Sequence, residues 1–312
     1  MLRTSLLAFA ALVLLAPLAR ADEGARSWAV ITDDDLPIYR TVLTGIAVEA
    51  PGPVDEYSLG GDVKLGADVM KRVVAKDPPV IIAVGPKAAN AAKKAAGKTP
   101  LVYCMVPRPE NYRLSGARVV GVRLELGYAA QLEALKALLP DVRRVAVVYD
   151  PSRSARTLAE AKRAADKAGV TLVPVEIRSP AEAGAALERH AGDAQALWMI
   201  SDPTVLNLQT FEAMLAFASA KKLPFFALNA GFVERGALFS FSVDYARLGR
   251  QVGKVASKLT EAGGDKGGLL PPDETEFAVN LSTAENLGSA GELYARVLSY
   301  AAEHKHAVRT YR

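Results

Sequence analysis

Cysteine and histidine are scarce in this chain. The 312 residues include one cysteine, Cys104, and three histidines, His190, His304 and His306. A single cysteine excludes an intrachain disulfide, and its place in the apolar run 100–106 predicts a buried small side chain rather than a nucleophile. None of the histidines stands beside a candidate nucleophile or a metal partner in the sequence.

Short sequence motifs that are typical of catalytic sites are also missing. The chain has no His-Glu-x-x-His metal motif, no Gly-x-Ser-x-Gly elbow and no Gly-x-x-x-x-Gly-Lys-Ser/Thr phosphate loop. The run Asp33-Asp34-Asp35 could hold a divalent cation, but an acidic turn at a helix start is the stronger interpretation. We therefore predict no catalytic residue, no metal and no cofactor. A hydrolase or lyase remains a weaker alternative, because a fold does not determine a function.

The net charge of the chain is small as well. The chain holds 38 Lys and Arg against 34 Asp and Glu, a formal net charge of +4. Two of these positive charges, Arg3 and Arg20, lie in the N-terminal leader described next. The remainder is too weakly basic for nucleic acid to be the expected partner.

The N-terminal segment has the three-part layout of a secretory signal peptide. Arg3 precedes an apolar run over 5–19, and small residues at Ala19 and Ala21 define a cleavage site. The run is shorter than the roughly 20 residues that a membrane-spanning helix needs. We therefore expect residues 1–21 to be removed near Ala21 and the mature protein to work in the periplasm.

Apolar runs and amphipathic segments alternate along most of the remaining chain. Strands are expected over 28–31, 56–59, 80–84, 101–106, 119–124, 144–149, 171–177, 196–200 and 224–228. Helical patterns separate them, and runs that are apolar throughout indicate parallel strands covered on both faces. The pattern restarts after residue 124, so the fold class is α/β with two Rossmann-like, doubly wound lobes.

In parallel sheets of this kind, ligands bind at the carboxyl ends of the strands. The loops that follow the expected strands carry acidic, hydroxyl and cationic side chains, so two facing sets of loops would line a cleft. Several of these side chains could instead cap the helix that follows, and for any single residue capping is the stronger interpretation.

An ordered set of short motifs resembles the periplasmic solute-binding proteins of ABC transporters, in the group with tryptophan- and tyrosine-type binding components. The motifs are Ile81-Ile-Ala-Val-Gly85, Ala88-Ala89, Thr99-Pro-Leu-Val102, Gly121-Val122, Leu138-Leu-Pro140, Val145-Ala-Val-Val-Tyr-Asp150, Ala196-Leu-Trp-Met199, Asp202, Pro224-Phe-Phe226, Gly236-Ala-Leu-Phe-Ser-Phe-Ser-Val-Asp-Tyr245, Leu248-Gly-Arg-Gln251, Asn280, Ala284 and Leu287-Gly288. They span nearly the whole mature chain.

The resemblance implies a type I periplasmic-binding fold, in which two lobes close by hinge bending around a small organic ligand. It implies crossings between lobes near 122–126, 239–243 and 269–275. Lobe 1 would hold 22–123 plus 244–270, and lobe 2 would hold 124–243 plus about 271–290, with a C-terminal tail over 291–312. The implied partner is the membrane permease of an ABC transporter, and the protein is expected to be a monomer.

Two loops depart from the pattern of this group. Pro86 and Lys87 follow Gly85, where a small hydroxyl residue is usual, and Arg108 replaces the aspartate of an Asp-Pro pair. A cleft-facing Arg108 would suit a carboxylate or another anion, whereas a surface Arg108 would say nothing about the ligand. The expected ligand-binding residues are Asp34, Pro86, Lys87, Arg108, Tyr149, Asp150, Ser152, Asp202, Thr204, Asn229 and Phe232.

A ligand-sensing subunit of a signalling system is the main alternative to a transport component. It would share the fold and the cleft and would differ only in its partner. Neighbouring reading frames would discriminate the two, because a permease and an ATPase indicate transport and a histidine kinase indicates sensing.

Overall fold

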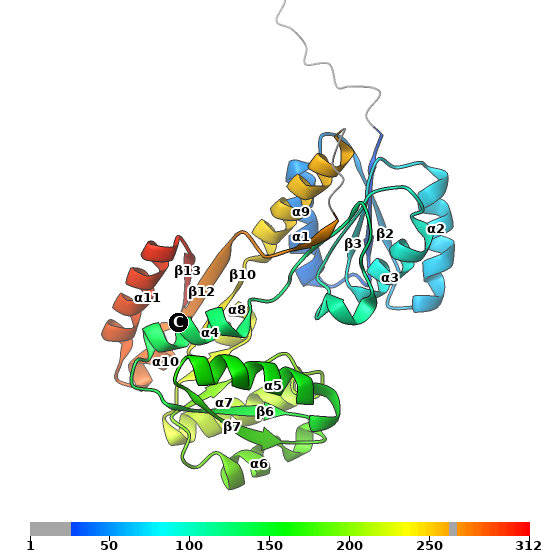
Figure 1. Cartoon of the computed structure of the whole chain (residues 1–312). Helices are drawn as coiled ribbons and strands as arrows, with labels where there is room; N and C mark the ends of the chain where they lie inside the picture. The colour runs from blue at the N-terminus through cyan, green and yellow to red at the C-terminus, as the bar shows by residue number, and fades with distance from the viewer. Residues whose placement is uncertain (1–25, 262–266) are drawn as a thin grey trace, which may run out of the picture.

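The computed structural model describes residues 26–261 and 267–312 (Figure 1). The signal peptide expected over 1–21 lies outside the described residues. Within them, no helix combines the length and the apolar character required to cross a membrane.

The first sheet contains six strands, and every adjacent pair is parallel. Its order is β11-β5-β4-β3-β1-β2. The strands are β1 (Trp28–Thr32), β2 (Val54–Ser58), β3 (Ile81–Val84), β4 (Leu101–Cys104), β5 (Val119–Val122) and β11 (Gly268–Leu270). The four central strands, β5, β4, β3 and β1, are buried along their whole length, as expected for a sheet covered on both faces.

Helices cover this sheet in two layers. The covering helices are α1 (Pro37–Glu49), α2 (Gly66–Ala75), α3 (Pro86–Ala95) and α9 (Tyr245–Thr260), with short 3-10 turns η1 (Val63–Leu65) and η2 (Pro109–Tyr112). One hydrophobic cluster joins α1 and α9 to the sheet, and a second cluster joins α2 and α3 to its other face. Helix α9 comes from far along the chain, yet it lies directly against α1 (Figure 1).

The second sheet contains seven strands in the order β13-β12-β10-β9-β8-β6-β7. The strands are β6 (Arg144–Tyr149), β7 (Thr171–Glu176), β8 (Ala196–Trp198), β9 (Phe225–Ala227), β10 (Phe239–Val243), β12 (Thr275–Asn280) and β13 (Ala307–Tyr311). Its helices are α4 (Tyr128–Leu138), α5 (Pro151–Lys167), α6 (Ala183–His190), α7 (Leu208–Lys221), α8 (Ala230–Glu234), α10 (Leu281–Asn286) and α11 (Ala290–His304), with the 3-10 turn η3 (Pro180–Glu182).

Two α/β lobes with parallel sheets were predicted, and the structure confirms this fold class. One pair of strands differs, because β10 and β12 are antiparallel. Strand β10 leads out of the second lobe toward α9, and β12 returns from the first lobe beside it. The two strands therefore run in opposite directions.

The chain passes between the two sheets three times. The passages are 123–127 from β5 to α4, Asp244 from β10 to α9, and 271–274 from β11 to β12. They occur in the same order along the chain as the crossings that the resemblance implies near 122–126, 239–243 and 269–275. The domain boundaries themselves stay a prediction.

The C-terminal segment differs from the tail expected over 291–312. Leu293, Val297 and Ala301 form one buried stripe on α11, and this stripe packs into the core of the second lobe. After α11, β13 pairs in parallel with β12 and forms the edge of the sheet. The segment is part of the second lobe because its helix carries an apolar face with four-residue spacing.

Two sequence-based expectations about buried residues are confirmed. Cys104 is fully buried, and burial raises the pKa of its thiol to about 12, which leaves it without thiolate character. Trp198, interpreted as a core residue, is also fully buried and donates its indole N–H to Gln131.

Candidate functional site

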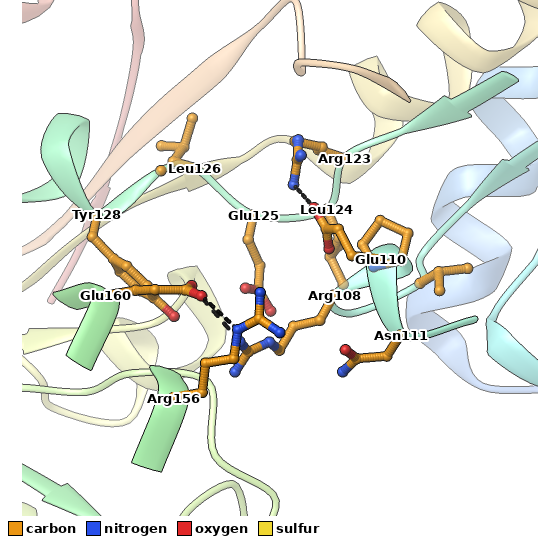
Figure 2. A pocket seen from close by; sticks show the side chains of 13 residues that line it. Arg108, Glu110, Asn111, Arg123, Leu124, Glu125, Leu126, Tyr128, Arg156 and Glu160 are labelled. Carbon is orange, nitrogen blue, oxygen red and sulfur yellow. Dashed lines mark hydrogen bonds and ion pairs between the residues drawn. The ribbon is translucent and has the colours of Figure 1, made fainter. Parts of the chain in front are cut away.

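A cavity of about 350 Å³ lies between the two sheets, beside the passage that joins β5 to α4 (Figure 2). Three segments form its wall: the loop after β4, the 123–127 passage with the first residue of α4, and α5 of the second lobe. The lining residues are Val106, Arg108, Pro109, Glu110, Asn111, Arg123, Leu124, Glu125, Leu126, Gly127, Tyr128, Arg156 and Glu160. Both lobes therefore contribute side chains to one space.

Arg108 reaches into this cavity from the first lobe. Its backbone is left-handed, with φ of 49°, and Met105 in the same loop has φ of 56°. Such angles are unusual for residues other than glycine and occur where the surrounding structure enforces them, often at functional sites. The loop thus holds Arg108 in a defined position at the mouth of the gap.

An ion pair joins the two lobes across the cavity. Arg108 Nη2 lies 3.7 Å from Glu160 Oε2, and Arg156 Nε lies 3.1 Å from Glu160 Oε1. Figure 2 shows the two guanidinium groups converging on this region. The carboxylate of Glu160 therefore faces two guanidinium groups.

Glu125 is the carboxylate at the centre of the wall. Figure 2 shows its side chain extending toward the guanidinium groups of Arg108 and Arg156. Burial raises the pKa of Glu125, and a hydrogen bond with Ser201 and the charge of Arg108 partly oppose that rise. Glu125 was not among the expected site residues, although it lies within the crossing expected near 122–126.

A second, smaller cavity of about 50 Å³ adjoins the same passage. It is lined by Leu124, Glu125, Leu126, Gln131, Leu228, Phe241, Ser242, Val243 and Tyr245. Burial raises the pKa of Tyr245 to about 12, and a hydrogen bond with Asn229 acts in the opposite direction. Asn229, an expected site residue, also caps α8 by accepting the backbone N–H of Gly231. Asn229 thus contacts Tyr245, which lines this smaller cavity, but is not itself part of the lining.

Four expected site residues form one compact network at the carboxyl ends of β6 and β8. Asp150 accepts the hydroxyl of Ser152 at 2.7 Å and the hydroxyl of Thr204 at 2.8 Å, and these bonds lower its pKa. Asp202 is fully buried and accepts the backbone N–H groups of Asp150 and Thr204. The carboxylates of this network cap α5 and order the loop after β8. Their role in ligand contact stays a prediction.

Three further expected residues lie at the carboxyl ends of β1 and β3. Pro86 opens α3, and Lys87 donates its ammonium group to the carbonyl of Gly61 at 2.6 Å. Asp34 accepts the backbone N–H of Asp35 and lines a separate cavity of about 100 Å³. None of the three lines the cavity that contains Arg108.

The two expected aromatic contacts point into the second lobe. Tyr149 is buried and donates its hydroxyl to Glu176 at 2.8 Å. Phe232 packs against Phe211 with ring centroids 4.8 Å apart. The aromatic ring that does line the cavity belongs to Tyr128, whose pKa is raised by burial.

The raised pKa of Glu125 predicts a pH-dependent stability. A raised pKa means that the folded state keeps the proton more readily, so this stabilisation is full below the ordinary pKa of glutamate and is lost as pH rises through the raised value. Glu125→Gln is neutral at every pH. Its melting temperature relative to wild type should therefore rise as the pH is increased from about 4, the ordinary pKa of glutamate, through the raised value.

Thermal unfolding of both proteins across this range is the measurement. Glu133→Gln, on the exposed side of α4, removes the same charge away from the cavity and is the control. A melting-temperature difference for Glu125→Gln that stays flat with pH, or falls as pH rises, would contradict the burial of an ionisable carboxyl here.

Comparison with known proteins gives one family and a consistent fold. Residues 54–305 match the family described as ABC transporter substrate binding protein. A tyrosine-binding protein of Clostridioides difficile (strain R20291) is 24% identical over 245 residues, which cover 75% of this chain and 70% of that protein.

Solved structures agree with the two-lobed architecture. The ligand-free, open structure of a substrate-binding protein with adhesive properties from Clostridium difficile has a TM-score of 0.77 at 22% identity, covering 85% of this chain and 95% of that chain. An ABC domain from Streptococcus pneumonia in complex with L-Trp has a TM-score of 0.64 at 21% identity, covering 87% of this chain and 98% of that chain.

Proposed function

This chain belongs to the family of ABC transporter substrate-binding proteins, and we propose that its solute is a small organic molecule with an anionic group and an apolar body. The observation that carries this proposal is the cavity between the lobes, where Arg108 and Arg156 converge on Glu160 and Glu125 is a second carboxylate beside Arg108. A ligand carboxylate would satisfy guanidinium donors that Glu160 and Glu125 cannot saturate, because each guanidinium carries five N–H groups.

The rest of the wall suits the other parts of such a molecule. Leu124 and Leu126 offer apolar surface, and Tyr128 offers an aromatic ring at the same cavity. Glu125 accepts or donates a hydrogen bond according to its protonation state, and the rise of its pKa brings that change closer to neutral pH. The relatives named for tyrosine and L-Trp make L-tyrosine and L-tryptophan the first probes to test.

Capture would follow from closure of the two lobes. Arg108 belongs to the first lobe and Arg156 to the second, so a ligand that touches both gains contacts when the gap narrows. A ligand shifts the equilibrium toward the closed state only by the difference between its affinities for the two states. The expected residues Asp34, Pro86, Lys87, Asp150, Ser152, Asp202, Thr204, Asn229, Tyr149 and Phe232 remain proposed contacts for that closed state.

We also propose where the protein works and which protein receives its solute. Substrate-binding proteins of ABC transporters act outside the cytoplasm, which agrees with a leader over 1–21 that is cut near Ala21 and with a periplasmic location. The partner is the transporter's permease, and the protein works as a monomer without enzymatic turnover.

Binding without turnover is the expected result for the correct solute. At about 100 times the dissociation constant, a ligand that binds only the folded state adds roughly 2.7 kcal/mol to the free energy of unfolding. Thermal shift and calorimetric titration with L-tyrosine, L-tryptophan and a panel of small carboxylates measure this, and mass analysis of the ligand afterwards tests for turnover.

Native mass spectrometry of protein purified from its own host searches for a co-purified molecule. A solute recovered intact, bound one to one and dependent on Arg108, supports the proposal. Chemical conversion of a bound molecule, or stabilisation only by cationic ligands, would overturn it.

A further inference from the structure

The last strand of the chain follows the part that matches the family. The match ends at residue 305, and β13 (Ala307–Tyr311) begins just after it. This strand forms the edge of the second sheet, beside β12, which is the first strand after the 271–274 passage. It therefore lies next to two of the three passages between the lobes.

The register of β13 on β12 places Arg309 over a buried carboxylate. Arg309 lies opposite Ala278, and Glu276 is two residues earlier on the same face of β12. The Arg309 Nη2 atom is 3.0 Å from Oε2 of Glu276, whose exposed fraction is only 5%. A buried carboxylate without a partner is strongly unfavourable, so this guanidinium is held in place from the second lobe.

The same guanidinium reaches the start of the first lobe's helix α9. Its Nη2 atom is 3.8 Å from Oδ2 of Asp244. The other carboxylate oxygen of Asp244 accepts the backbone N–H groups of Ala246 and Arg247, at 2.9 and 3.1 Å. Asp244 therefore caps the helix that packs on α1, and Arg309 connects this cap to the sheet of the other lobe.

Neighbouring contacts strengthen the same junction. Arg247 pairs with Glu274 in the 271–274 passage. The Nδ1 atom of His306 is hydrogen-bonded to the hydroxyl oxygen of Thr275 at 2.8 Å. His306 also packs on Phe241 of β10, with centroids 4.8 Å apart. The C-terminal segment thus touches both β10, which leaves the second lobe here, and β12, which enters it.

We propose that Arg309 is a positioning residue for ligand capture, which holds the two lobes in the arrangement seen in this structure by bridging Glu276 and Asp244 across the hinge. The proposal rests on lobe closure, the motion that the proposed function requires. On this proposal, closure rotates the start of α9 against the second sheet and loosens the bond to Asp244. Loss of Arg309 therefore favours the closed state and raises affinity.

The test compares Arg309→Gln with Arg312→Gln, which removes the same charge three residues later. Spin labels at Arg72→Cys on α2 and Arg189→Cys on α6 report the separation of the lobes by electron–electron resonance, and the buried Cys104 does not interfere. Arg309→Gln should shift the ligand-free distance distribution toward the distances seen with bound probe. Arg309→Lys, which keeps the charge, should restore part of the wild-type distribution.

Affinity for whichever probe binds, L-tyrosine or L-tryptophan, should rise about two- to fivefold in Arg309→Gln, because a half-exposed ion pair is weak. A ligand-free distribution identical to that of wild type, or a lower affinity, would overturn the role of Arg309. If neither the two amino acids nor any carboxylate of the panel binds wild type, the proposed ligand class fails. The ligand-free distances still decide the inference about Arg309, because Arg309→Gln should differ from wild type and Arg312→Gln should not.

Discussion

Gly249→Ala should lower the free energy of unfolding by about 2–3 kcal/mol, a large effect for one methyl group. A β-carbon at Gly249 would lie 2.1 Å from the carbonyl oxygen of Val42 and 3.0 Å from the α-carbon of Gly45. These contacts are with backbone atoms, which cannot move aside as a flexible side chain does. Helices α1 and α9 would have to separate, and the hydrophobic cluster between them would open.

Gly291→Ala is the matched control for this change. Gly291 also lies in a helix, α11, but a β-carbon there has no heavy atom within 4 Å. Alanine is the better helix former by about 1 kcal/mol, so this variant should be neutral or slightly more stable. Urea denaturation of both variants gives the comparison. Equal stabilities would mean that the α1–α9 contact is looser than the structure shows.

The alternation of apolar runs and helical segments was enough to predict the two-lobed fold. It works because a strand buried on both faces must be apolar throughout, and each parallel crossover needs a helix. Two short strands escaped this logic. Strand β11 has only three residues, beginning at Gly268, and β13 exposes Arg309 and Thr310 at a sheet edge, so neither shows a buried run.

The candidate site was harder to predict than the fold. Arg108 was found because it departs from the pattern of similar proteins, and the structure places it in the cavity. Glu125 was missed because its environment comes from Ser201 and Arg108, which are distant in the sequence. A usable signal did exist, because a residue in a segment that crosses between the lobes lies beside the gap between them. A charged residue such as Glu125 in that segment was therefore a candidate for the site. Asp150 and Asp202 follow strands as ligand contacts do, but the same position also suits caps.

Arg108→Gln should weaken binding of a carboxylate-bearing probe by roughly ten- to a hundredfold. Glutamine keeps much of the length and the hydrogen-bonding capacity of the side chain but loses the charge and the paired donors. In the ligand-free protein the change leaves Glu160 with Arg156, 3.1 Å away, so folding stability should change little. Calorimetric titration measures the loss, and thermal unfolding without ligand checks the fold.

Glu160→Gln is the informative counterpart, because it acts on the same ion pair from the other side. Glu160 pairs with both Arg108 and Arg156, so it competes with an anionic ligand for the same donors. Removing its charge should raise the affinity for a carboxylate probe, whereas Arg108→Gln lowers it. If both variants weaken binding equally, the pair serves only to join the lobes. If both leave binding unchanged, the ligand does not use this cluster, and the anionic class proposed for it is wrong.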